Sequence, residues 1–109
     1  MYFRDSETEW DKFGEGITRK IIGHDENLMM VKVKFEKGAQ VPFHQHPHVQ
    51  CSVVYSGIFE VVIGTEPSTL KAGDGFFVSP EIPHRARAIE AGIIIDSFYP
   101  AREDFLNKS

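Results

Sequence analysis

Cysteine is nearly absent from this sequence, and so are long apolar runs. Among its 109 residues there is one cysteine, Cys51, so no internal disulfide can form and a cysteine-rich zinc site is excluded. No stretch approaches the roughly 20 apolar residues of a membrane-spanning helix. The first ten residues lack the apolar core of a signal peptide. We therefore expect a cytoplasmic protein with no membrane partner.

Basic residues are also in deficit. Lysine and arginine total 12 against 16 aspartates and glutamates, which gives a net charge of −4. Because phosphate binding requires a basic surface, nucleic acid is not expected as a partner. Hydrophobic residues nevertheless make up 41% of the chain, which is too many for a disordered protein. The length allows one domain, which we place at residues 1–109.

Short runs with the period of a β-strand fill much of the chain. Met29–Phe35 alternates between apolar and polar side chains, as a half-buried strand does. Further strands are expected at Gln50–Tyr55, Ile58–Ile63, Phe76–Val78, Pro83–Ile89 and Ile93–Tyr99, with turns at Ser56-Gly57 and Ala91-Gly92 among others. This spacing is typical of an all-β sandwich or barrel. A single helical turn fits within Pro100–Asn107.

Five histidines are the unusual feature of the composition, and three of them fall within five residues. His44 and His46 are two apart, so on an extended chain their side chains project from the same face, and Gln50 shares that phase. His84 begins a later strand. Imidazoles from two strands with a nearby oxygen donor make a ligand set for a divalent transition metal. A His-x-His pair by itself also occurs by chance on protein surfaces.

The order of these residues resembles the two sequence motifs of the cupin superfamily. The first motif, G-x5-H-x-H-x3-E-x6-G, is matched by Gly38, His44, His46, Gln50 and Gly57. The second, G-x5-P-x-G-x2-H-x3-N, is matched by Gly73, Pro80 (one residue late) and His84, with Ile82 and Ala88 as departures. The resemblance covers about residues 28–105. It implies a single-domain jelly-roll barrel, a double-stranded β-helix, with one metal ion held by His44, His46, Gln50 and His84.

A glutamine stands where most metal cupins have glutamate. That departure makes the iron or manganese redox chemistry of many cupins less expected, although those metals remain possible. A neutral amide with three neutral imidazoles leaves the ion its full charge and favours Lewis-acid chemistry. Zinc or nickel suits such a ligand set.

The chain is similar, more narrowly, to small bacterial pectin-degradation cupins that linearise 4,5-unsaturated monouronates. The similarity lies in Asn27–Val31, His46–Gln50 and Asp96–Leu106. It implies a non-redox enzyme, isomerase-like in its hydration and ring opening, with Asp96 and Arg102 as catalytic residues. Arg102 would also bind the uronate carboxylate, and Phe98 would pack against the sugar ring. The family further implies a homodimer.

Two other functions stay open. One is an iron- or manganese-dependent oxygenase, and the other is a module that binds a small sugar or acid without turnover. Single residues also have structural alternatives. Asp96 can cap the turn before Pro100, and Arg102 can pair with Glu103 or Asp104 on the surface. The role of His48 stays open between a supporting residue and the site entrance.

The remaining polar residues are expected to be structural. We expect Cys51 to face away from the metal and to be buried, since it alternates with Gln50. His24 is expected in a solvated loop. Lys12, Arg19 and Lys20 are expected to be solvated charges.

Overall fold

The computed structural model describes residues 1–106 and consists almost entirely of β-strands. A short 3-10 turn, η1 (Asp5–Glu7), precedes them. The strands are β1 (Asp11–Gly14), β2 (Ile17–His24), β3 (Met29–Phe35), β4 (Gln40–His44), β5 (Val49–Ile63), β6 (Glu66–Lys71), β7 (Gly75–Val78) and β8 (His84–Tyr99). One short helix, α1 (Glu103–Leu106), follows them. The expected all-β class is confirmed. Helix α1 lies within the predicted Pro100–Asn107, of which Asn107 is outside the described residues.

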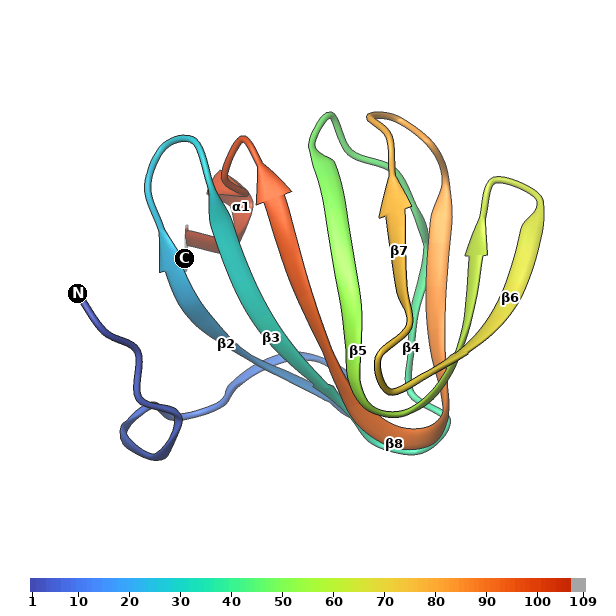
Figure 1. The fold of residues 1–109 in the computed structure, drawn as a ribbon, viewed down its shortest axis with the longest axis horizontal. Helices are drawn as coiled ribbons and strands as arrows, with labels where there is room; N and C mark the ends of the chain where they lie inside the picture. The colour runs from blue at the N-terminus through green and yellow to red at the C-terminus, as the bar shows by residue number, and fades with distance from the viewer. Residues whose placement is uncertain (107–109) are drawn as a thin grey trace.

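The two long strands, β5 and β8, are the central pair of the sheet. They pair antiparallel from Val49↔Tyr99 to Ile63↔His84, and both bend sharply near their middle (Figure 1). One half of this pair carries β3, β2, β1 and β7, while the other half carries β4 and β6. The bend therefore folds one sheet into two facing layers, which is the jelly-roll arrangement.

The turns predicted at Ser56-Gly57 and Ala91-Gly92 are wrong, because each pair lies inside a continuous strand. A Cβ on Gly92 would lie 2.1 Å from the Ser56 carbonyl oxygen, so the backbones approach more closely there than a side chain permits. Gly57 has a φ of 83°, a conformation that glycine adopts without strain. The glycines thus mark a corner where paired strands pass from one layer to the other.

Four strands were not predicted, namely β1, β2, β4 and β6. They extend the sheet on both layers, and β2 pairs with β3 from Ile17↔Phe35 onward. The alternation predicted for Met29–Phe35 is confirmed, because Met29, Val31, Val33 and Phe35 are all buried. Their side chains form part of a single apolar core between the layers.

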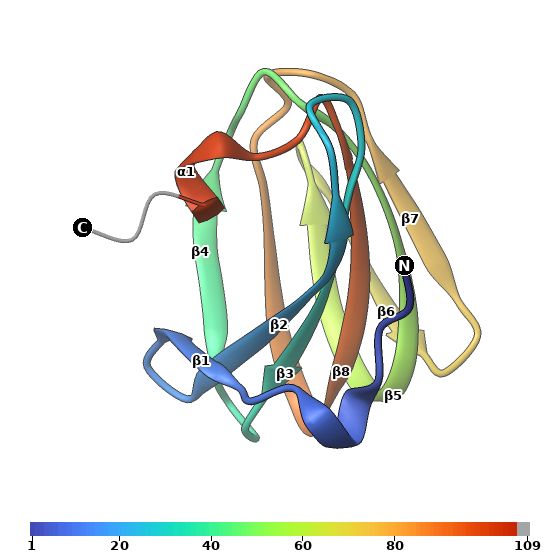
Figure 2. The same cartoon turned by 90° about the vertical axis from the view of Figure 1, so that its left-hand side faces the viewer.

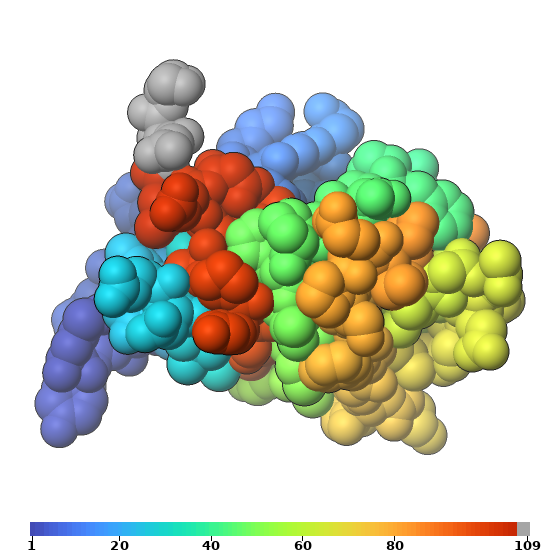
Figure 3. Space-filling model, turned by 90° about the horizontal axis from the view of Figure 1, so that it is seen from above, coloured from blue at the N-terminus to red at the C-terminus, as the bar shows by residue number. Residues whose placement is uncertain are grey.

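The C-terminal segment covers one end of the barrel. After β8 the chain turns away, so that α1 lies beside the strands and does not extend them (Figure 2). Seen from above, this segment lies between the β2–β3 connection and the β4–β5 connection (Figure 3). No helix in the described part of the chain is long and apolar enough to cross a membrane.

Candidate metal centre

Three histidines converge between the two layers at this end of the barrel. Strands β4 and β8 pair so that His44 lies opposite His84, and His46 follows in the connection to β5. One ring nitrogen from each residue lies within 4.8 Å of the others. The rings are close, with centroids 4.2 Å apart for His44 and His84 and 4.9 Å for His46 and His84.

Each imidazole is oriented by a backbone carbonyl two residues away. Nδ1 of His44 donates to the Pro42 oxygen at 2.9 Å. Nδ1 of His46 and of His84 bond in the same way, to the oxygens of His48 at 3.0 Å and Ile82 at 2.8 Å. Because a carbonyl only accepts, the proton of each neutral ring is at Nδ1 and Nε2 carries a lone pair. Burial lowers the pKa of all three histidines, that of His84 to about 4, which favours these neutral rings.

The Gln50 side chain points its oxygen at the same place. Its amide nitrogen donates to Ser52 Oγ at 3.1 Å and to Asp96 Oδ1 at 3.3 Å, so the amide oxygen faces the histidines. That oxygen lies 3.1 Å from His46 Nε2. His46 Nε2 and the Gln50 amide oxygen therefore both present lone pairs to each other, with no hydrogen atom between them to form a bond.

This donor set fits a metal ion. The buried Nε2 of His84 has no hydrogen-bond partner among the described residues, and a buried polar atom left alone is costly. A shared cation would satisfy this nitrogen and would remove the conflict between His46 and Gln50. Three imidazoles and one amide oxygen suit a divalent transition ion, and the carbonyls behind the rings are the usual outer partners of metal-bound histidine.

Asp96 lies beside this cluster, paired across the sheet with Ser52 on β5. Ser52 donates its hydroxyl to Asp96 Oδ1 at 2.6 Å. Asp96 therefore lies within the second half of β8, and its carboxylate is held by Ser52 and does not cap the turn before Pro100. Burial raises the pKa of Asp96 to about 6, although the hydrogen bonds from Ser52 and Gln50 and the charge of Arg102 act in the opposite direction.

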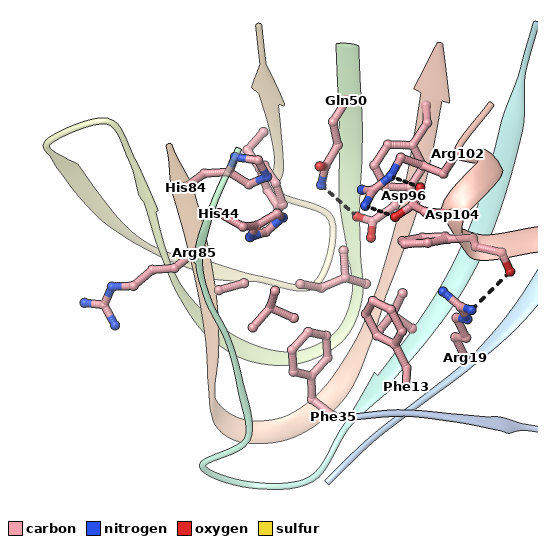
Figure 4. Close-up of a pocket in the computed structure, with 17 residues that line it drawn as sticks. Phe13, Arg19, Phe35, His44, Gln50, His84, Arg85, Asp96, Arg102 and Asp104 are labelled. Carbon is pink, nitrogen blue, oxygen red and sulfur yellow. Dashed lines mark hydrogen bonds and ion pairs between the residues drawn. The ribbon is translucent and has the colours of Figure 1, made fainter. Parts of the chain in front are cut away.

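A cavity of about 360 Å³ between the layers is lined by His44, His84, Gln50 and Asp96, among others (Figure 4). That volume is in the range of small-molecule sites. The cavity wall is largely apolar. Its lining also includes Phe13, Arg19, Phe98, Arg102, Asp104 and Phe105.

Of the two roles that the sequence left open for Arg102, the structure shows the ion pair with Asp104. Its Nε and Nη2 donate to the two carboxylate oxygens of Asp104 at 2.9 and 2.7 Å, so the pair with Asp104 exists. The Arg102 side chain is nevertheless only 12% exposed and lines the cavity. Phe98 is 3% exposed and also lines the cavity, so it serves both the core and the cavity wall.

Several expectations for other polar residues need correction. Arg19 and Lys20 are buried, at 9% and 5% exposure, because aromatic rings cover their charged ends and Lys20 also bonds to Asp5. Cys51 is exposed, since it lies on the outer face of β5 opposite Gln50, the direction predicted. His24 is exposed, as expected, but it is the last residue of β2 and does not lie in a loop.

His48, whose role the sequence left open, supports the cluster through its backbone. Its carbonyl oxygen holds the ring of His46, and its own ring packs edge-on against that ring at 5.4 Å. Ser52 and Asp104 are site residues that the sequence analysis did not single out. Serine on a strand carries no signal of its own, and Asp104 was considered only as a surface partner of Arg102.

The chain matches the cupin domain family over residues 31–95. It is 46% identical over 107 residues to the pectin degradation protein KdgF of Dickeya dadantii (strain 3937), covering 96% of this chain and 97% of that protein. The solved structure of KdgF from a Halomonas species superposes with a TM-score of 0.94 at 39% identity, covering 96% and 97% of the two chains. The crystal structure of an RmlC-like cupin from Shewanella frigidimarina NCIMB 400 superposes with a TM-score of 0.93 at 42% identity, covering 95% of this chain and 94% of that chain.

Proposed function

The chain belongs to the cupin family, and from that premise we propose that it is a metal-dependent enzyme that converts 4,5-unsaturated monouronates to linear 5-keto-4-deoxyuronate. The observation that carries the proposal is the convergence of three ring nitrogens and an amide oxygen next to Asp96 in one cavity. The similarity to two proteins named KdgF, one of them described as a pectin degradation protein, supports the substrate class.

We propose His44, His46, His84 and Gln50 as the residues that hold the metal ion, with zinc or nickel as the ion. When bound there, a divalent ion would supply Lewis acidity to an oxygen of the substrate. A neutral ligand set leaves that acidity undiminished, because no ligand carboxylate offsets the charge.

Asp96 is the residue proposed to move protons. In the reaction, water adds across the C4–C5 double bond, with hydrogen at C4 and hydroxyl at C5. The C5–ring oxygen bond then breaks to leave a ketone at C5, and the hydrate at C1 loses water to give the aldehyde. Both hydrogen bonds from Ser52 and Gln50 end on Oδ1 of Asp96, so Oδ2 is available to take and return protons.

Arg102 and Phe98 are proposed to position the substrate. Phe98 presents a buried ring on the cavity wall, against which a sugar ring can pack. Arg102 offers a planar group suited to a carboxylate. Its pair with Asp104 has the bidentate form that a substrate carboxylate would adopt.

The test is the loss of ultraviolet absorbance of a 4,5-unsaturated monouronate prepared with a polysaccharide lyase. Metal-loaded protein should accelerate this loss well above the spontaneous rate, chelator-treated protein should not, and restored zinc or nickel should recover it. Absence of acceleration with metal-loaded protein would contradict the proposal. Substrate binding without turnover would support a binding module in its place.

We also propose the homodimer that the family resemblance implies. Exposed apolar side chains on the outer face of β5 and β7 support it, namely Val53, Tyr55 and Phe77 at 40%, 61% and 57% exposure. Light scattering behind size exclusion should give twice the 12.4 kDa chain mass. A monomer at micromolar concentration would contradict this part of the proposal.

A further inference from the structure

Arg19 is a buried cation that the proposed reaction leaves without a role. It lies on β2, opposite Val33 of β3, and lines the same cavity as His44, His84 and Asp96 (Figure 4). Its guanidinium carbon is 4.5 Å from the centre of the Phe13 ring and 4.2 Å from that of Phe105. These rings stabilise the cation but offer it no oxygen acceptor.

The hydrogen-bond donors of Arg19 are incompletely used. Nη2 donates to the Phe105 carbonyl oxygen at 3.2 Å, while buried Nε and Nη1 have no partner among the described residues. The surrounding charges are the carboxylates of Asp11 and Asp104 and the guanidinium of Arg102. A buried ionised group with unpaired donors is costly, so a ligand that pairs with them gains more than it would from a solvated arginine.

Arg102 presents the opposite situation. Its Nε and Nη2 are both engaged by Asp104, which already occupies the side of the guanidinium that best receives a carboxylate. Both arginines lie 4.2 Å from the ring of Phe105. The part of the cavity around Phe105 therefore carries two cations, and Nε and Nη1 of Arg19 are the donors there that have no acceptor among the described residues.

We infer that Arg19 is a carboxylate-binding residue of this cavity, which holds the carboxylate of a uronic acid together with Arg102 while the rest of the sugar extends toward the histidine cluster. This inference rests on the proposed function for its substrate class. It makes Arg19 a determinant of specificity, because a neutral sugar in the same place would leave the buried donors unpaired.

A purely structural role for Arg19 makes a different prediction. The bond to the Phe105 carbonyl ties β2 to α1, and loss of that tie would loosen the cavity wall for every ligand. A structural residue would therefore affect acidic and neutral sugars equally. A carboxylate-binding residue affects the acidic sugar alone, and a lysine in its place recovers part of the loss.

The experiment compares D-galacturonate, an unreactive carboxylate probe, with D-galactose, its neutral analogue. Both are titrated into metal-loaded protein and followed by NMR chemical shifts. In Arg19→Gln the affinity for galacturonate should fall about tenfold or more, and that for galactose should stay within about twofold. Arg19→Lys should lower the affinity for galacturonate less than Arg19→Gln does, because lysine keeps the charge but lacks the planar group. Arg87→Gln, which removes the same charge from an arginine with a 41% exposed side chain that pairs with Glu60, is the matched control.

Turnover of the unsaturated uronate gives a second measurement, in which Arg19→Gln should raise KM far more than it lowers kcat. Unchanged galacturonate affinity in the Gln variant overturns the inference, as does an equal loss for galactose. If the Gln variant does not fold, the Lys variant decides, and unchanged affinity for galacturonate there overturns it. Selective loss of galacturonate binding in a protein without turnover would contradict the proposed reaction and leave Arg19 as a carboxylate-binding residue.

Discussion

The histidine end of the cavity and its arginine end are held in place by different kinds of contact. Each histidine ring is oriented by a carbonyl only two residues away, so its direction follows from local backbone. At the other end, around Phe105, Arg19 is held by the backbone carbonyl of Phe105, 86 residues away. The direction of each histidine ring is therefore set locally, although the rings meet only because β4 pairs with β8. The orientation of Arg19, in contrast, depends on a contact with a distant segment.

The largest effect should come from breaking the histidine end. His46→Ala removes one of four proposed ligands, so affinity for the metal should fall by more than about 100-fold and turnover should be lost. Metal content after dialysis, measured by plasma mass spectrometry, checks this. The control is His24→Ala, which removes an exposed histidine from the end of β2. Equal metal content in the two variants would contradict the ligand assignment.

Asp96→Asn should separate chemistry from metal binding. The group that takes and returns protons is lost, so kcat should fall by about 10²–10⁴-fold while metal content stays near that of the wild type. Rates from the ultraviolet assay and metal analysis of the same sample provide the measurement. Full activity in this variant would remove Asp96 from the mechanism.

A smaller effect is expected from Ser52→Ala, which deletes the 2.6 Å hydrogen bond to Asp96 and the acceptor for the Gln50 amide. Loss of one charge-assisted hydrogen bond corresponds to about a tenfold fall in kcat. Ser97→Ala is the matched control, since Ser97 pairs with Cys51 and shares its outward phase on the neighbouring strand. If both variants keep wild-type rates, Ser52 does not position Asp96.

The smallest effect should come from Asp104→Asn at the arginine end. Removing this carboxylate frees Arg102 from a competitor, so KM should fall by about threefold with little change in kcat. Glu103→Gln removes the same charge from the neighbouring residue and should leave KM unchanged. A rise in KM for Asp104→Asn would mean that Asp104 holds Arg102 in the orientation that the substrate needs.

The difference between the two ends also explains which residues could be predicted. The spacing of His44 and His46, with Gln50 in the same phase, is visible in the sequence and is enough to propose a ligand set. Arg19 was wrongly expected in solvent, because an isolated arginine in a sequence carries no sign of the rings that will cover it. Ser52 was missed for the same reason, since only the pairing of β5 with β8 places it opposite Asp96.

The strands show a similar division. Alternation identified Met29–Phe35 and both halves of β5 and β8, because a strand with one buried face has a period of two. It did not reveal that the halves are continuous. In a sequence, a glycine is compatible either with a turn or with a bend inside a strand. Here the close approach of the Gly92 and Ser56 backbones shows that it is a bend.

By itself, then, the sequence determined the all-β class, the resemblance to cupins and the histidines and glutamine of the candidate metal site, because all of these depend on residue type and short spacing. Tertiary structure alone decided that β5 and β8 are continuous bent strands, that Asp96 accepts a hydrogen bond from Ser52, and that Arg19 lies buried in the cavity wall, where two of its donors have no partner among residues 1–106. The physical reason is that burial and pairing are properties of contacts between distant segments, and these contacts exist only once the two layers have closed on each other.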